Sequence, residues 1–167
     1  KIHATGNVDE IMLDVSKDIC ALFNADRLTI YVVGEDNISL VSKVKTGLNS
    51  FKDLKLPIAE QSLAGYAAMH KKLLNIKDVY DEKELAQYSN HLRFLQEVDK
   101  RTGYRTKQML VAPILDAASG DLVGVIQVIN NKAGAPFAAM IQEGVQELAQ
   151  TMAVALRQHQ RQQNSTA

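Results

Sequence analysis

The chain has 167 residues, of which 46% are hydrophobic and 23% are charged, and its 19 basic residues balance its 19 acidic residues. This size and composition indicate one globular domain, and the neutral charge balance gives no electrostatic reason to expect nucleic acid or a membrane surface as a partner. A single cysteine, Cys20, excludes an internal disulfide framework and suits a reducing compartment, so we expect a cytoplasmic protein with no membrane insertion.

The N-terminal part of the chain predicts a helix and then a hairpin. Apolar residues recur at steps of four and three from Val8 to Phe23, which is the period of one helix face. Residues 28–33 and 39–44 are rich in β-branched residues and flank the turn GEDN, so they predict two antiparallel strands. Residues 55–58 predict a short edge strand, because Pro57 cannot donate a ladder hydrogen bond.

The middle of the chain predicts two short helices. Ser62 is a good N-cap for a helix that ends near Lys71. Asp81 and Glu84 have the spacing of a capping box, and the helix that they open carries apolar residues on one face. Those apolar residues are Leu85, Tyr88, Leu92 and Leu95.

Three more strands and a long helix are predicted. The strands are residues 73–76, 109–115 and 122–130, of which the last is apolar on both faces and therefore central. The final helix runs from Phe137 to about Gln160, and its heptad-spaced residues are Ile141, Val145, Leu148, Met152, Ala155 and His159. Tight turns between neighbouring strands predict a mainly antiparallel sheet and the class α+β.

We expect a single domain over residues 1–167, with its core at about 9–157 and a polar tail or linker at 158–167. The first residue is Lys and not Met, which indicates a piece of a longer chain. The sequence predicts no catalytic site. The four histidines lack the spacing of metal ligands, and neither a nucleophile elbow nor a phosphate-binding loop is present. We therefore expect no catalytic residue, no metal and no cofactor, and we interpret Cys20 as a small packed residue.

Three features suggest a binding site, and each has a simpler interpretation. The polar run VDKRTGYRTKQML, residues 98–110, enters a buried strand, as pocket-lining loops do, or it is an ordinary solvated loop. Gln127 shares a strand face with Val123, Val125 and Ile129, where a buried amide contacts either a ligand or a neighbouring protein group.

The third feature is the start of the helix capped by Ser62. Its first turn contains the small residues Ala64 and Gly65, which let an anion approach the free backbone N–H groups. The simpler interpretation is a capped helix with a close packing contact.

Taken in order, five segments resemble a GAF domain over about residues 9–157. They are ADRLTIYVV, LPIAEQSLAGYAA, LLNIKDVYD, VDKRTGYRTKQMLVAPI and GDLVGVIQVINNK. The segments are similar to the GAF domains of cyclic-nucleotide phosphodiesterases and cyclases, and to those attached to bacterial secretion and pilus-assembly ATPases. The resemblance implies a six-stranded antiparallel sheet, with the first and last helices on one face and a ligand pocket on the other.

The resemblance also implies six ligand-binding residues. One lies on the first strand near a nucleobase, one at a helix start near a cyclic phosphate, three in a loop that closes over the ligand, and one on the central strand. These residues are Thr29, Ala64, Asp99, Thr102, Thr106 and Gln127.

The chain departs from the cyclic-nucleotide pattern at three places, one of which is the exit of the second strand, where Lys45 and Thr46 replace an aromatic residue and an acid. In the motif Asn-Lys…Phe-x-x-x-Asp-Glu, residues 131–132 and Phe137 match, but Ile141 and Gln142 occupy the acidic positions. The Lys-to-acid bridge of that motif is therefore missing unless Glu143 replaces it. The stretch from Asp78 to Asp99 is also longer than in the phosphodiesterases. Its apolar residues Leu92, Phe94 and Leu95 could fill the pocket.

Two functions remain open at this point. The first is a non-catalytic regulatory sensor of a small molecule, with a cyclic nucleotide as one candidate, in a larger signalling or secretion protein. It would transmit through its terminal helices, which would also form a homodimer. The second is a ligand-free dimerisation or protein-interaction module with a plugged pocket.

Overall fold

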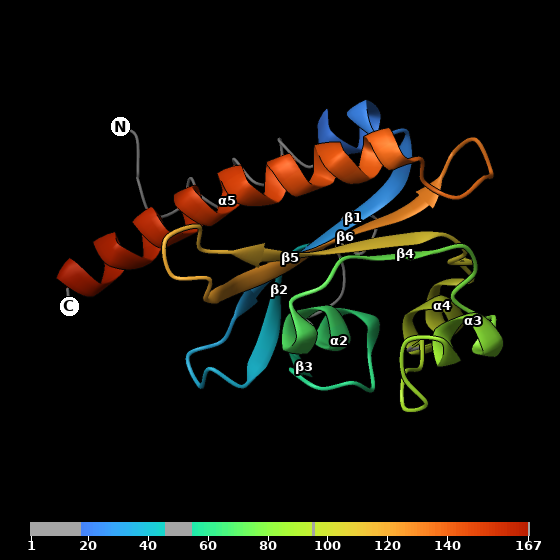
Figure 1. Ribbon diagram of the computed structural model, residues 1–167, viewed down its shortest axis with the longest axis horizontal. Coiled ribbons are helices and arrows are strands. Elements are labelled where there is room, and N and C mark those ends of the chain that lie inside the picture. The colour runs from blue at the N-terminus through green and yellow to red at the C-terminus, as the bar shows by residue number, and fades with distance from the viewer. Residues whose placement is uncertain (1–17, 46–54, 95, 167) are drawn as a thin grey trace.

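The computed structural model describes residues 18–45, 55–94 and 96–166, with the backbone alone for residues 43–45, 97–98, 102 and 159–166. A helical turn at residues 18–22 precedes ten labelled elements (Figure 1). These are β1 Ala25–Val33, β2 Ser39–Lys45, β3 Lys55–Pro57, α2 Leu63–His70, β4 Leu74–Ile76, α3 Glu82–Ala86, α4 Glu97–Thr102, β5 Met109–Leu115, β6 Leu122–Asn131 and α5 Ala139–Thr166.

The strands form one six-stranded sheet in the order β3-β2-β1-β6-β5-β4. Every neighbouring pair is antiparallel, which confirms the predicted α+β class and sheet. The strand at residues 122–130 is central as predicted, because it pairs with β1 on one side and β5 on the other. Within the described part of the chain, the edge strands β3 and β4 have three residues each.

Helices cover both faces of the sheet. Figure 1 shows α5 lying along one face, beside the helical turn at residues 18–22, and α2, α3 and α4 on the other. The buried residues form two clusters accordingly. The α5-side core includes Leu28, Ile30, Ile126, Val128, Val145 and Ala149. The α2-side core includes Tyr31, Leu40, Ala64, Leu85, Val111 and Val125.

Four of the six heptad-spaced residues of the last helix face the sheet, whereas Ala155 is exposed and the side chain of His159 lies outside the described part of the chain. Val145 is completely buried, and Ile141, Leu148 and Met152 pack against the α5-side core. The predicted helix is confirmed, although it begins at Ala139 and continues to Thr166. Of the first predicted helix, residues 8–17 lie outside the described part of the chain, and residues 18–22 are helical.

The helix predicted to open at Asp81 is shorter than its apolar spacing indicated. Asp81 caps it as expected, accepting hydrogen bonds from the N–H groups of Lys83 and Glu84. The carboxylate of Glu84 completes no capping box, because it accepts from the N–H groups of residues 77 and 78. The helix ends at Ala86.

Beyond α3, the chain makes a turn in which the N–H of Leu92 donates to the carbonyl of Ser89. Leu92 is nevertheless completely buried, while Leu95 lies outside the described residues. Among the described helices, none combines the length and the apolar character needed to cross a bilayer.

Candidate ligand site

Two predicted site residues, Thr29 and Gln127, lie side by side in the sheet. They are direct partners in the ladder between β1 and β6, and their exposed fractions are 5% and 8%. The residues that flank Thr29 point into the α5-side core, so Thr29 faces the α2 side. Within the described part of the chain, neither side chain forms a hydrogen bond, and the polar atoms of both keep some contact with solvent, because Asn75 Oδ1 is the one fully buried polar side-chain atom there that lacks a partner. A hydroxyl and an amide are thus offered to a molecule on this face.

The face of Gln127 differs from the prediction at one neighbour. Val125 and Ile129 belong to the α2 side as expected, but Val123 is part of the α5-side core. The cause is a register shift between Ile114 and Leu115, after which Leu122 and not Val123 turns toward α2.

The start of α2 lies over the same face of the sheet. Ala64 is completely buried in the α2-side core, and α2 contacts both β5 and β6. The hydroxyl of Ser62 accepts from the N–H of Gly65 at 3.0 Å. A Cβ at Gly65 would overlap the carbonyl oxygen of Ala59, so close packing alone requires glycine here. The N–H groups of residues 63 and 64 belong to the first turn, where no helical carbonyl accepts them.

Asp99 and Thr106 are brought together, but they bind each other. The Asp99 Oδ1 accepts from the Thr106 hydroxyl at 2.8 Å, and its Oδ2 accepts from the Thr106 N–H at 2.8 Å. The hydroxyl of Tyr80 donates to the same Oδ2 at 2.6 Å. We call these three residues the Asp99 latch. Desolvation, followed by the bond to Asp99, raises the pKa of Tyr80 to about 12.

The Asp99 latch is shielded by aromatic and cationic neighbours. The Arg105 guanidinium lies 3.8 Å from the centre of the Tyr80 ring, and Phe94 meets that ring edge-on. With Asp99 and Thr106 both buried, their polar atoms hold the polar run closed on the protein. A direct ligand contact by these two residues stays a prediction.

Thr102, the remaining predicted residue of the polar run, has a side chain outside the described part of the chain. Its backbone ends α4, a short helix in a segment that we had interpreted as a loop. Gly103 follows with φ of 74°, a left-handed conformation that favours glycine and ends the helix.

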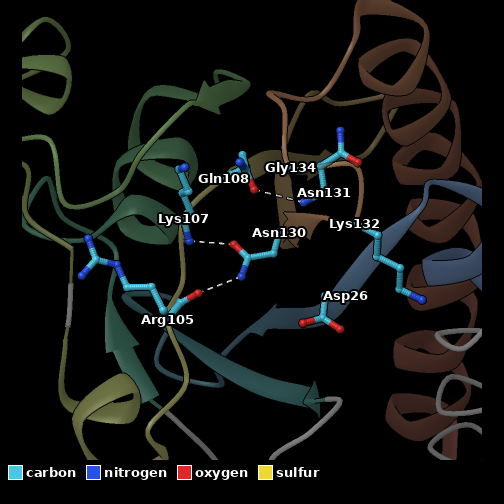
Figure 2. A pocket seen from close by; sticks show the side chains of 8 residues that line it. All are labelled: Asp26, Arg105, Lys107, Gln108, Asn130, Asn131, Lys132 and Gly134. Atoms are coloured by element: carbon cyan, nitrogen blue, oxygen red, sulfur yellow. Dashed lines mark hydrogen bonds between the residues drawn. The ribbon is translucent and has the colours of Figure 1, made fainter.

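Asn130 was missed by the sequence analysis, yet it fastens the polar run to the sheet. Its Nδ2 donates to the Tyr104 hydroxyl at 2.9 Å and to the Arg105 carbonyl at 2.8 Å. Its Oδ1 accepts from the N–H of Lys107 at 2.6 Å (Figure 2). Asn130 has φ of 56°, which asparagine tolerates better than most residues. The sequence feature that could have identified Asn130 is its position as an asparagine at the end of a predicted strand.

A second attachment involves Tyr104. Its hydroxyl donates to Asp26 Oδ2 at 2.5 Å, and the Arg27 guanidinium lies 3.5 Å from the centre of its ring. Burial, then the bond to Asp26, raises the pKa of Tyr104 above its ordinary range. The polar run is therefore tied to β1 as well as to β6.

An open depression of about 480 Å³ lies beside these attachments. It is lined by Asp26, Arg105, Lys107, Gln108, Asn130, Asn131, Lys132 and Gly134. In Figure 2 the side chains of Arg105, Lys107 and Lys132 extend in three different directions. They do not converge on one anion. Elsewhere in the described part of the chain, no cluster of three or more His, Cys, Asp or Glu side chains could hold a metal.

The departure from the cyclic-nucleotide motif has a structural counterpart. Among the described residues, Lys132 forms no ion pair, and Glu143 does not replace the missing acid. Ile141, at one acidic position, packs against the α5-side core. The long stretch before the polar run also contributes apolar side chains, since Leu92 is buried and Phe94 packs against the α2-side core.

Comparison with known proteins points to one family. The family model of the GAF domain matches residues 7–156. The chain is 32% identical over 145 residues to the dual 3',5'-cyclic-AMP and -GMP phosphodiesterase 11A of Takifugu rubripes, covering 72% of the chain and 15% of that protein. It is 30% identical over 182 residues to the dual 3',5'-cyclic-AMP and -GMP phosphodiesterase 11 of Drosophila melanogaster, covering 90% of the chain and 12% of that protein. The chain thus spans under a fifth of these relatives.

Solved structures share the fold at low sequence identity. The GAF domain of a phosphoenolpyruvate-protein phosphotransferase from Coxiella burnetii aligns with a TM-score of 0.73 and 20% identity, over 94% of this chain and 86% of that one. Residues 122 to 287 of a methyl-accepting chemotaxis protein align with a TM-score of 0.71 and 18% identity, over 90% and 89%.

Proposed function

The chain belongs to the GAF domain family, and from this premise we propose that it is a regulatory small-molecule sensor within a larger cytoplasmic signalling or secretion protein. The observation that carries the proposal is the buried pair Thr29 and Gln127, a hydroxyl and an amide that lack partners among the described residues. Side chains this buried usually form hydrogen bonds, and a ligand on the α2 side would supply them in place of the little solvent that reaches these atoms.

A cyclic nucleotide is the first candidate ligand. Relatives of the chain are cyclic-AMP and cyclic-GMP phosphodiesterases. An amide and a hydroxyl can each both donate and accept, as the edge of a nucleobase requires. The first turn of α2, with Ala64, offers backbone N–H groups and the positive end of a helix dipole, which suit a phosphate.

The remaining predicted contacts, Asp99, Thr102 and Thr106, would act from the polar run. Asp99 and Thr106 bond to each other, so we propose that ligand binding changes the hydrogen bonds within the Asp99 latch. The sensory unit would extend over residues 1–167, with its core at about 9–157 and residues 158–167 leading onward. Catalysis by the whole protein would lie outside this domain.

Thermal unfolding with cyclic AMP and cyclic GMP tests the proposal. Ligand at 100 times its Kd stabilises the folded state by about 2.7 kcal/mol, which raises Tm by about 5–10 °C for a domain of this size. AMP and GMP serve as controls for the cyclic phosphate. The double variant Thr29→Val, Gln127→Leu should lose the shift, whereas Gln150→Leu on the exposed side of α5 should keep it. A shift that survives the double variant would remove Thr29 and Gln127 from the site.

The alternative is a ligand-free interaction module whose pocket is plugged. The buried Leu92 and the motif residue Lys132, which forms no ion pair with another described residue, favour it. In that case the wild-type chain should show no shift with any nucleotide. A shift that appears only in Leu92→Ala would identify the plug.

A homodimer is part of both proposals. Since four of the heptad-spaced residues of α5 pack on the sheet, the contact would use the opposite side of the helix. There, Met140 and Val154 are 80% and 57% exposed, and their separation of 14 residues corresponds to two heptads.

A further inference from the structure

Two side chains from opposite faces of the sheet hold the same turn. The Lys71 Nζ, at the end of α2, donates to the Gly120 carbonyl at 2.8 Å. The Arg157 Nε, in α5, donates to Asp116 Oδ2 at 3.0 Å. Gly120 and Asp116 both belong to the β5–β6 turn, residues 116–121. We propose that this turn couples α2, the helix that begins at the ligand site, to α5, the helix that leaves the domain.

Hydrogen bonds within the β5–β6 turn make it rigid. The Asp116 N–H donates to the Asp121 carbonyl at 2.9 Å, and the Gly120 N–H donates to the Asp116 carbonyl at 2.7 Å. The Asp116 Oδ1 also accepts from the Ala118 N–H at 2.9 Å. Gly120 has φ of 76°, which glycine adopts without strain. Because these bonds close the turn on itself, a force on Gly120 reaches Asp116.

The attachment to α5 is the stronger of the two. Asp116 and Arg157 have side chains that are 18% and 32% exposed, so solvent screens their attraction only partly. The Arg157 Nη2 also lies 3.7 Å from Asp121 Oδ2. One carboxylate oxygen of Asp116 therefore holds the turn together while the other holds α5.

The attachment to α2 starts from Lys71, whose backbone is held at the end of the helix. Lys71 is the C-cap of α2, with φ of 54°, and its N–H donates to the Ala67 carbonyl. The eight residues of α2 form a rod of about 12 Å, so a displacement at its first turn reaches its end. The ligand-dependent part of this coupling depends on the proposed function, but the mechanical part does not.

Hydrogen exchange without ligand tests the mechanical part. Lys71→Met should speed exchange in residues 116–121 and in α5 near Arg157 by about two- to fivefold, which is the effect of losing one exposed hydrogen bond. Lys72→Met, a change of the neighbouring exposed lysine, should leave both segments unchanged. Reciprocally, Arg157→Gln should speed exchange at the end of α2. Equal rates in Lys71→Met and the wild-type chain, or the same effect in Lys72→Met, would overturn the coupling.

The same measurement with cyclic AMP or cyclic GMP tests the ligand-dependent part. In the wild-type chain, exchange should slow in α2 and in α5 near Arg157. In Arg157→Gln, exchange should slow in α2 alone, and slowing at both helices would reject the turn as the route. If neither nucleotide changes any rate while the ligand-free effects appear, the coupling stands and the proposed ligand class is wrong.

Discussion

Single residues decide where the two central strands can approach each other. Gly124 of β6 faces β1 so closely that a Cβ would overlap the carbonyl oxygen of Tyr31. The neighbouring atoms are backbone in the middle of the sheet, which cannot move aside as a flexible side chain can.

Gly124→Ala should therefore lower the free energy of unfolding by about 1–3 kcal/mol, the usual cost of overpacking a core. Gly103→Asn is the control, because a Cβ at Gly103 meets no atom within 4 Å and asparagine tolerates its left-handed backbone. Its cost should stay below about 1 kcal/mol. Urea unfolding measures both, and equal losses would mean that the contact with Tyr31 is not limiting.

The Asp99 latch gives a second prediction at this scale. Tyr80→Phe deletes one donor to a buried carboxylate and should cost about 1–2 kcal/mol. Tyr88→Phe is a matched control, since Tyr88 is partly exposed and only its backbone carbonyl accepts a hydrogen bond, from Tyr66. Urea unfolding that gives the same small loss for both variants would show that Asp99 is not held by Tyr80.

Among the elements, α5 shows how one sequence pattern can serve two structures. Heptad spacing suits a coiled coil, but it also suits a helix that lies on a sheet, because both partners contact one apolar side. Val145 and Leu148 fit either arrangement in the sequence, and the structure shows them against the sheet.

Val154→Glu should consequently convert any dimer to a monomer without unfolding the domain. Leu148→Glu would be a poor test, because Leu148 packs against the α5-side core and its loss would disturb the fold as well. Sedimentation gives the mass, and circular dichroism shows that the fold is retained. A dimer that persists in both Val154→Glu and Met140→Glu would place the interface elsewhere.

The strands were predictable because their β-branched runs and turn residues act locally. The stretch between α3 and β5 was not, because its structure depends on distant partners. Leu92 is buried although its backbone is a turn, and α4 forms within a run of charged residues. Likewise, the pairing of Thr29 with Gln127 follows from the order of strands, whereas the capture of Asp99 by Tyr80 depends on a tertiary contact. No spacing in the sequence reveals such a contact.

At the scale of the whole molecule, acid should weaken the fold in a defined way. Among the described residues, three carboxyl groups have a pKa below the ordinary value: Asp36, through the Ile38 N–H; Glu60, through the Ser89 hydroxyl; and Asp116, through the Ala118 N–H. Because each pKa is lower in the folded state than in the unfolded state, the unfolded chain binds more protons in acid. Their stabilisation is thus complete above the unfolded values, near about pH 4–5, and is lost as pH falls through the folded values.

Thermal unfolding between pH 7 and pH 2 tests this expectation. In Asp116→Asn, Tm should start lower at neutral pH and fall less steeply below about pH 4, because one of the three carboxyl groups no longer titrates. Parallel curves for the variant and the wild-type chain would mean that Asp116 does not contribute.

The two edges of the sheet have a consequence for proteins that carry several such domains in one chain. An unpaired sheet edge is a template on which a neighbouring sheet can add a strand, and this is a common start of aggregation. Here β3 ends at Pro57, which has no N–H to donate, and in β4 the side-chain amide of Asn75 donates to the Phe137 carbonyl, which brings residue 137 against this edge. Because Pro57 at one edge and the contact with Phe137 at the other hinder the addition of a strand, tandem copies can be held at high local concentration without their sheets merging into one.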